Sequence, residues 1–134
     1  MTNETSVWLT EFIQAGGGVA GTVHLRENDE LVLSAAHNIP PRVLKQVDRI
    51  PRGKGMAGLA FERNDVVNTC NLQTDKSGDV QPGAKAVKAL AGIAIPVHAA
   101  DGEIRAIVGI AYAEQRDISG DELEGIVTAA KKLP

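Results

Sequence analysis

The chain has 134 residues, 43% of them hydrophobic and 23% charged, a composition typical of one globular domain with a single core. The net charge of −3 and the 3% aromatic content do not favour nucleic acid or an anionic membrane surface as a partner. Its one Cys cannot form a disulfide within the chain, and the sequence contains no secretory signal and no run of about 20 apolar residues. We therefore expect a cytoplasmic protein with one domain over residues 1–134.

The first part of the sequence predicts a helix, a β-hairpin and a second short helix. Apolar residues at helical spacing predict a helix over residues 6–15, which ends at three glycines. Alternating residues predict strands over 19–26 and 30–36, joined by a tight turn. Two prolines at positions 40 and 41 predict the start of a short helix through residue 47.

The last part of the sequence predicts a loop, a weak helix, a second hairpin and a final helix. A polar loop over 73–83 precedes a helix over 84–91. Strands over 92–98 and 103–113 are joined by an Asp-Gly turn, and the second is apolar enough for a central strand buried on both faces. Pro96 predicts a bulge or an unpaired position in the first of them. Ser119 and Glu122 have the spacing of a capping box, which predicts the start of the last helix.

Residues 50–75 predict a turn, a short helix, a strand and a loop. Asn64 is placed to end the helix in the left-handed conformation. This stretch resembles the core motif of the GAF domain family, and the matching positions are Ile50-Pro51, Gly53, Gly55, Gly58, Ala60, Val66-Val67, Asn71-Leu72 and Asp75.

The order of the predicted elements favours an α+β fold with an antiparallel sheet, because the strands come in hairpins and helices lie at both ends. The resemblance implies a GAF-like fold. It has a central antiparallel β-sheet of five to six strands, with the terminal helices on one face and short helices plus loops over the other. A ligand pocket is expected beneath those loops.

Gly53, Gly55 and Gly58 also spell the G-x-G-x-x-G pattern of dinucleotide-binding proteins. That motif requires a buried parallel strand directly before it, and residues 47–51 are too short and too charged for one. We therefore interpret the glycines as positions that permit unusual backbone angles or close contacts.

The candidate ligand-binding residues are Thr22, His24, Thr69, Cys70, Asn71 and Asp75. Thr22 and His24 share one face of a predicted strand, which meets either solvent or a pocket. Together with the helix start near Gly55 they favour a small polar or anionic ligand, and protonation of His24 would strengthen anion binding as the pH falls through about 6.5. Asp75 has an alternative role in fixing the loop.

The sequence predicts no catalytic residue, no metal site and no cofactor. The GAF subfamily that reduces free methionine sulfoxide uses several cysteines, and the matching segments here, 56–58 and 82–87, contain none. The bilin-binding and cyclic-nucleotide signatures are also missing. We therefore predict a small-molecule-binding sensory or regulatory domain and not an enzyme. The alternatives are a ligand-free dimerisation or protein-interaction module and, more weakly, a redox enzyme related to free methionine-R-sulfoxide reductase.

The predicted terminal helices carry broad apolar faces that include Trp8 and Phe12. One sheet face has to cover both helices, so we expect a homodimer that uses them as its interface.

Overall fold

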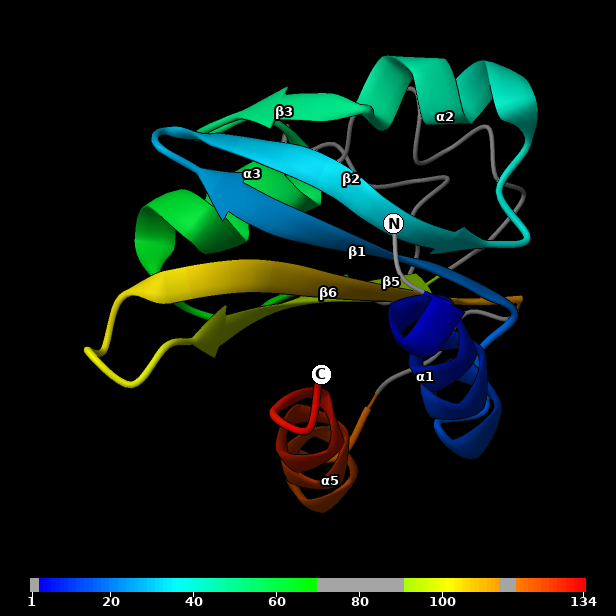
Figure 1. Cartoon of the computed structure of the whole chain (residues 1–134). Helices are drawn as coiled ribbons and strands as arrows, with labels where there is room; N and C mark the ends of the chain where they lie inside the picture. The colour runs from blue at the N-terminus through cyan, green and yellow to red at the C-terminus, as the bar shows by residue number, and fades with distance from the viewer. Residues whose placement is uncertain (1–2, 70–90, 114–117) are drawn as a thin grey trace.

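The computed structural model describes residues 3–69, 91–113 and 118–134. Within that part, a six-stranded antiparallel sheet in the order β3-β2-β1-β6-β5-β4 carries helices on both faces (Figure 1). The strands are β1 (Ala20–Glu27), β2 (Glu30–His37), β3 (Arg49–Pro51), β4 (Val67–Thr69), β5 (Ala91–His98) and β6 (Ile104–Tyr112). The helices are α1 (Asn3–Ala15), α2 (Pro41–Val47), α3 (Gly55–Arg63) and α5 (Gly120–Ala130). The predicted α+β architecture is confirmed.

The terminal helices α1 and α5 pack against the same face of the sheet (Figure 1). Their apolar side chains join those of the central strands in one buried cluster, which includes Leu9, Phe12, Ile13, Val23, Ile93, Ile95, Val108, Ile110, Ile126 and Ala130. The predicted start of α5 is confirmed, since the Ser119 hydroxyl accepts a hydrogen bond from the Glu122 amide at 3.2 Å. The sheet face under these helices is therefore filled with side chains.

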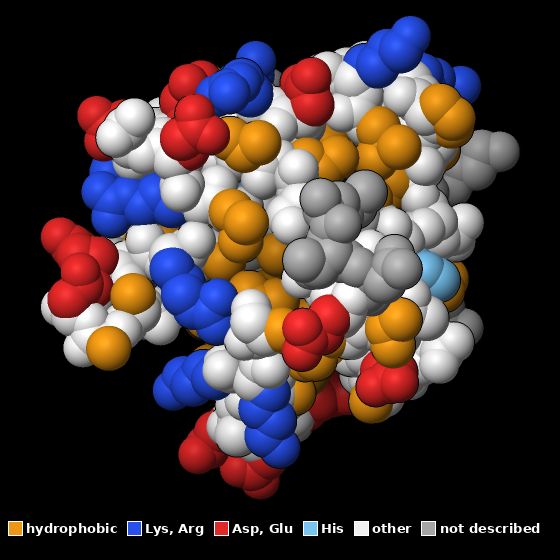
Figure 2. Space-filling model, viewed as in Figure 1, with side chains coloured by type: hydrophobic (Ala, Val, Ile, Leu, Met, Phe, Trp, Pro, Cys, Tyr) orange, Lys and Arg blue, Asp and Glu red, His pale blue; other side chains and the backbone are white. Residues whose placement is uncertain are grey.

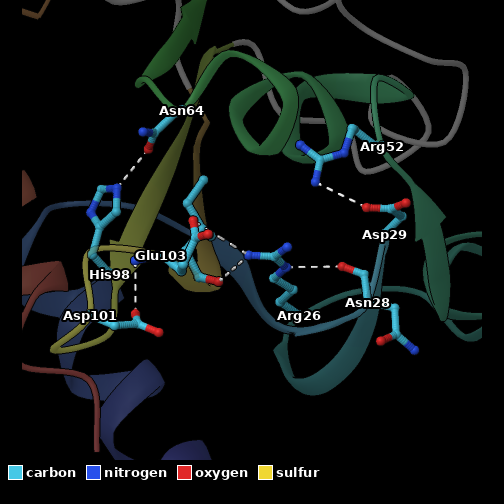
Figure 3. Close-up of polar contacts among 9 residues, drawn as sticks. Arg26, Asn28, Asp29, Arg52, Asn64, His98, Asp101 and Glu103 are labelled. Carbon is cyan, nitrogen blue, oxygen red and sulfur yellow. Dashed lines mark hydrogen bonds and ion pairs between the residues drawn. The ribbon is translucent and has the colours of Figure 1, made fainter.

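The opposite face carries α3 over a second buried cluster. This cluster consists of Leu31, Ala60, Phe61, Val67, Ala94, Ile104 and Ile107. Asn64 ends α3 with φ 53° and ψ 46°, the left-handed conformation expected of it, and its amide donates to the Ala60 carbonyl. Asn64 also accepts a 2.6 Å hydrogen bond from Nε2 of His98, which ties the end of α3 to the end of β5 (Figure 3).

The local backbone explains why glycines occur in the 50–75 motif. Gly53 and Gly55 have φ values of 86° and 68°, which residues with a side chain rarely adopt. The Gly53 amide donates to the Gly58 carbonyl at 2.8 Å, which closes the turn between β3 and α3. The preceding strand β3 is an edge strand antiparallel to β2, so no βαβ unit surrounds the motif and the dinucleotide interpretation is excluded.

Several details differ from the sequence prediction, and α1 begins at Asn3 and not at residue 6. Strand β3 was not predicted, because its three residues have no apolar pattern and become a strand only by pairing with β2. Ala91 opens β5, whereas it was expected to end a helix over 84–91, and the rest of that segment lies outside the described residues. The short strand expected at Val66 begins one residue later, at Val67.

Other strand predictions are confirmed. The β1–β2 hairpin turns at Asn28, with φ 57°, and β6 lies in the middle of the sheet with most of its residues buried. Pro96 is paired with Ile107 of β6, and only its β4 side is unpaired as predicted, because the last β4–β5 pair is Val67 with Ala94. None of the described helices has the length and apolar character required to cross a bilayer.

Acidic and basic side chains lie side by side over the β1–β2 hairpin and β3 (Figure 2). Arg49 contacts Glu27 and Glu30 at 3.5 and 3.3 Å, and Arg52 contacts Asp29 at 3.2 Å. These pairs are exposed and each contributes little to stability, on the order of 1 kcal/mol or less.

Candidate functional site

A cavity of about 590 Å³ lies between the sheet and a wall formed by α2, β3 and the start of α3. This volume is within the range of ligand pockets, roughly 300–1,000 Å³. The described residues that line it are Gly21, Thr22, His24, Ile39, Val43, Gln46, Val47, Arg49, Ile50, Lys54, Gly55, Met56, Ala57, Gly92, Ile93, Ala94, Gly109, Ile110 and Ala111.

The floor of the cavity is a patch of small residues on two neighbouring strands. Gly92 of β5 pairs with Ala111 of β6, and Ala94 pairs with Gly109. Thr22 of β1 pairs with Gly109 on its other side. Because none of these positions carries a large side chain, the space above this part of the sheet is not filled from below.

The wall of the cavity is mainly apolar. Val43 and Val47 come from α2, Ile50 from β3, and Met56 from the first turn of α3. The charged lining residues, Arg49 and Lys54, are exposed, so their side chains belong to the rim of the cavity.

His24 is the most buried polar side chain of the site, with 2% of its surface exposed. Its Nε2 lies 2.7 Å from the carbonyl oxygen of Val47, at the end of α2. A carbonyl oxygen can only accept a hydrogen bond, so Nε2 carries a hydrogen and donates it. The bond joins the sheet to the wall of the cavity.

Burial lowers the pKa of His24 below the ordinary value of 6.5, and the hydrogen bond to the Val47 carbonyl offsets part of that effect. His24 is therefore neutral near pH 7. The sequence prediction placed its protonation near pH 6.5, and this is corrected to a lower pH because the imidazolium would be buried away from water.

The stability of the protein should fall as the pH drops below about 6.5. The unfolded chain binds a proton at His24 in this range, whereas the folded chain does not until its own lower pKa is reached. Urea unfolding at several pH values should therefore show a loss of stability that His24→Phe removes. His98→Gln, at an exposed position, should keep that loss, and identical pH profiles for the wild type and His24→Phe would contradict the assignment.

The structure brings two of the six predicted ligand residues to the cavity, since both Thr22 and His24 line it. Thr69 ends β4, and nothing is described of its side chain. Cys70, Asn71 and Asp75 lie outside the described residues, so their part in the site remains a prediction. Among the described residues, no three His, Cys, Asp or Glu side chains come together as a metal site.

The sequence prediction missed the small-residue floor and the α2 wall. A signal for the floor was present, because Gly92 and Ala94, like Gly109 and Ala111, are small residues two positions apart on one face of a strand. Their register across the sheet was needed to show that they meet.

No protein-family model and no curated protein matches the sequence. Solved structures do match. The GAF domain of a phosphoenolpyruvate-protein phosphotransferase from Acinetobacter is 17% identical, with a TM-score of 0.77 over 98% of this chain and 78% of that one. The corresponding domain from Coxiella burnetii is 18% identical, with a TM-score of 0.71 over 98% and 90%. This chain has the GAF fold.

The GAF fold also occurs in enzymes. The type II free methionine-R-sulfoxide reductase from Thermoplasma acidophilum is 17% identical to this chain, with a TM-score of 0.68 over 94% of this chain and 89% of that one. At such identities a similarity shows the fold alone. The function therefore depends on the residues that line the cavity.

Proposed function

We propose that this chain is a sensory or regulatory GAF domain that binds a small molecule in the cavity above β5 and β6. The observation that supports it best is the patch of Gly92, Ala94, Gly109 and Ala111 under a cavity of about 590 Å³. A sheet that served only as a scaffold would gain stability by filling this space with larger side chains. With small residues at these four adjoining positions the domain is less stable than it would be with larger ones, but it has room for a ligand.

A sensor protein among the similar structures supports the same proposal. The putative GAF sensor protein from Burkholderia vietnamiensis is 17% identical to this chain, with a TM-score of 0.69 over 98% of this chain and 85% of that one. A reductase activity is less well supported, because the chain contains one Cys and a thiol cycle through an internal disulfide needs two. We therefore propose a binding function without turnover.

Ala111→Leu tests the proposal, since it fills the cavity from the floor. A thermal-shift screen of metabolites should find a compound that stabilises the wild type, by about 2.7 kcal/mol at a hundred times its dissociation constant. Ala111→Leu should abolish that shift. The matched control Ala113→Leu, at an exposed position just after β6, should retain it.

A screen in which no metabolite shifts the wild type would contradict the proposal. Equal shifts in Ala111→Leu and Ala113→Leu would also contradict it, because the ligand would then bind elsewhere. The ligand-free interaction module would then be the better interpretation.

The homodimer through α1 and α5 remains a prediction. Val7 of α1 is 56% exposed, and Trp8 beside it is partly buried. Phe12 is only 6% exposed, because it stacks on Trp8 and packs into the core of its own chain. Val7 and Trp8 are therefore the residues of α1 that we expect at the interface.

A further inference from the structure

The polar groups inside the cavity restrict the chemistry of its ligand. Most lining side chains are apolar, and the cations Arg49 and Lys54 are exposed at the rim. A charged group deep in the cavity would lose its water, and the charged side chains of the described lining, Arg49 and Lys54, lie at the rim and not beside it. The interior therefore favours an uncharged, largely apolar molecule.

His24 favours a ligand that carries a hydrogen-bond donor. Because Nε2 donates to the Val47 carbonyl and the ring is neutral, Nδ1 carries a lone pair and no hydrogen. Nδ1 is buried and has no hydrogen-bond partner among the residues that the structure describes. A buried acceptor left unpaired destabilises a protein, so a group that donates to it gains more than an ordinary surface hydrogen bond would provide.

We infer that the ligand is a small, uncharged, largely apolar molecule that donates an N–H or O–H hydrogen to Nδ1 of His24. This inference rests on the proposed function, because it names the class of molecule that occupies the same cavity. Nδ1 has almost no exposed surface in the structure, so the ligand reaches it only if the atoms that cover the nitrogen move aside. The class differs from the small polar or anionic ligand expected from the sequence, because a carboxylate would place its oxygen lone pairs against the lone pair of Nδ1.

Two size-matched probes, indole and benzofuran, test the donor requirement. Both are flat bicyclic molecules that fit a cavity of about 590 Å³, but indole carries an N–H where benzofuran carries an acceptor oxygen. Benzofuran is the more apolar of the two, so hydrophobic burial alone favours it. Calorimetric or NMR titration of the wild type should nevertheless show indole binding roughly tenfold more tightly. Benzoate, an anion of similar size, should bind more weakly than indole.

His24→Phe keeps a flat ring at the same position and removes the acceptor. In this variant the preference for indole should disappear. If the variant does not fold, the comparison of indole with benzofuran on the wild type still decides the question.

Equal binding of the two probes, tighter binding of benzofuran or benzoate, or no binding of any of them would overturn the inferred ligand class. A preference for indole that persists in His24→Phe would overturn the role of Nδ1. Neither result would contradict the proposed function, which fails separately if the Ala111→Leu variant responds to metabolites like its control.

Discussion

Phe61→Ala should lower the free energy of unfolding by about 3–5 kcal/mol, as expected for removal of a fully buried aromatic side chain. Phe61 is 2% exposed and lies in the cluster that joins α3 to the sheet. Two cations cover its ring, with Cζ of Arg52 4.0 Å and Cζ of Arg26 5.3 Å from the ring centroid. A domain of this size has a total stability of about 5–15 kcal/mol, so the variant should be close to unfolding.

The arginines over Phe61 are themselves held by acidic neighbours. Arg52 contacts Asp29, and Arg26 lies 4.0 Å from Glu103 (Figure 3). Phe61→Leu keeps an apolar side chain but removes the aromatic face, so it separates packing from the cation–π contacts, each of which contributes about 0.5–2 kcal/mol.

Urea unfolding with both variants measures these effects. We expect the leucine variant to lose about 1–2 kcal/mol, less than the alanine variant. A loss below about 1 kcal/mol for Phe61→Ala would contradict the view that α3 is anchored through this residue. Since α3 carries part of the cavity wall at Met56 and Ala57, the same variant should also weaken ligand binding.

Gly58→Ala should destabilise the protein by about 1–3 kcal/mol, although alanine is the better helix former. A Cβ atom at this position would lie 2.7 Å from the carbonyl oxygen of Pro51 and 3.2 Å from the amide nitrogen of Gly53. Both are backbone atoms of the turn that the Gly53–Gly58 hydrogen bond closes, so they cannot move aside without breaking that turn. Thermal or urea unfolding measures the loss.

Gly125→Ala is the matched control, because Gly125 is also inside a helix, but beyond the local backbone of α5 none of the described residues has an atom within 4 Å of its added Cβ. Here the helix propensity of alanine should act alone and stabilise the protein by about 1 kcal/mol. If alanine stabilised the protein at both positions, or destabilised it at both, the close approach of the turn would not be the reason why position 58 is a glycine.

The elements that were predicted well are those with a local chemical signal. The hydroxyl of Ser119 caps α5, Asn64 takes the left-handed conformation after α3, and the Asp101-Gly102 turn joins β5 to β6. Each signal acts within four residues, so no knowledge of the tertiary structure was needed. Strand β3 has no such signal, and it forms because Ile50 pairs with Leu31 of β2.

The candidate site could be predicted only in part. The alternation of residues along a strand placed Thr22 and His24 on one face, and this is confirmed. Alternation does not say whether that face meets water, so the burial of His24 and the lowered pKa that follows from it were not foreseen. The hydrogen bond to Val47 could not be predicted from the sequence either, because it joins residues 23 positions apart.

The sequence by itself determined the order of the described elements other than β3, the hairpin turns and the glycine motif before α3, because short-range backbone preferences and hydrophobic periodicity control these features. Only the tertiary structure decided which small residues meet. Gly92 and Ala94 lie opposite Ala111 and Gly109 because the β5–β6 hairpin aligns them in that register. It also decided that His24 is neutral and that its Nδ1 accepts no hydrogen bond from the described residues, because both properties depend on burial and on a carbonyl group supplied by a distant helix.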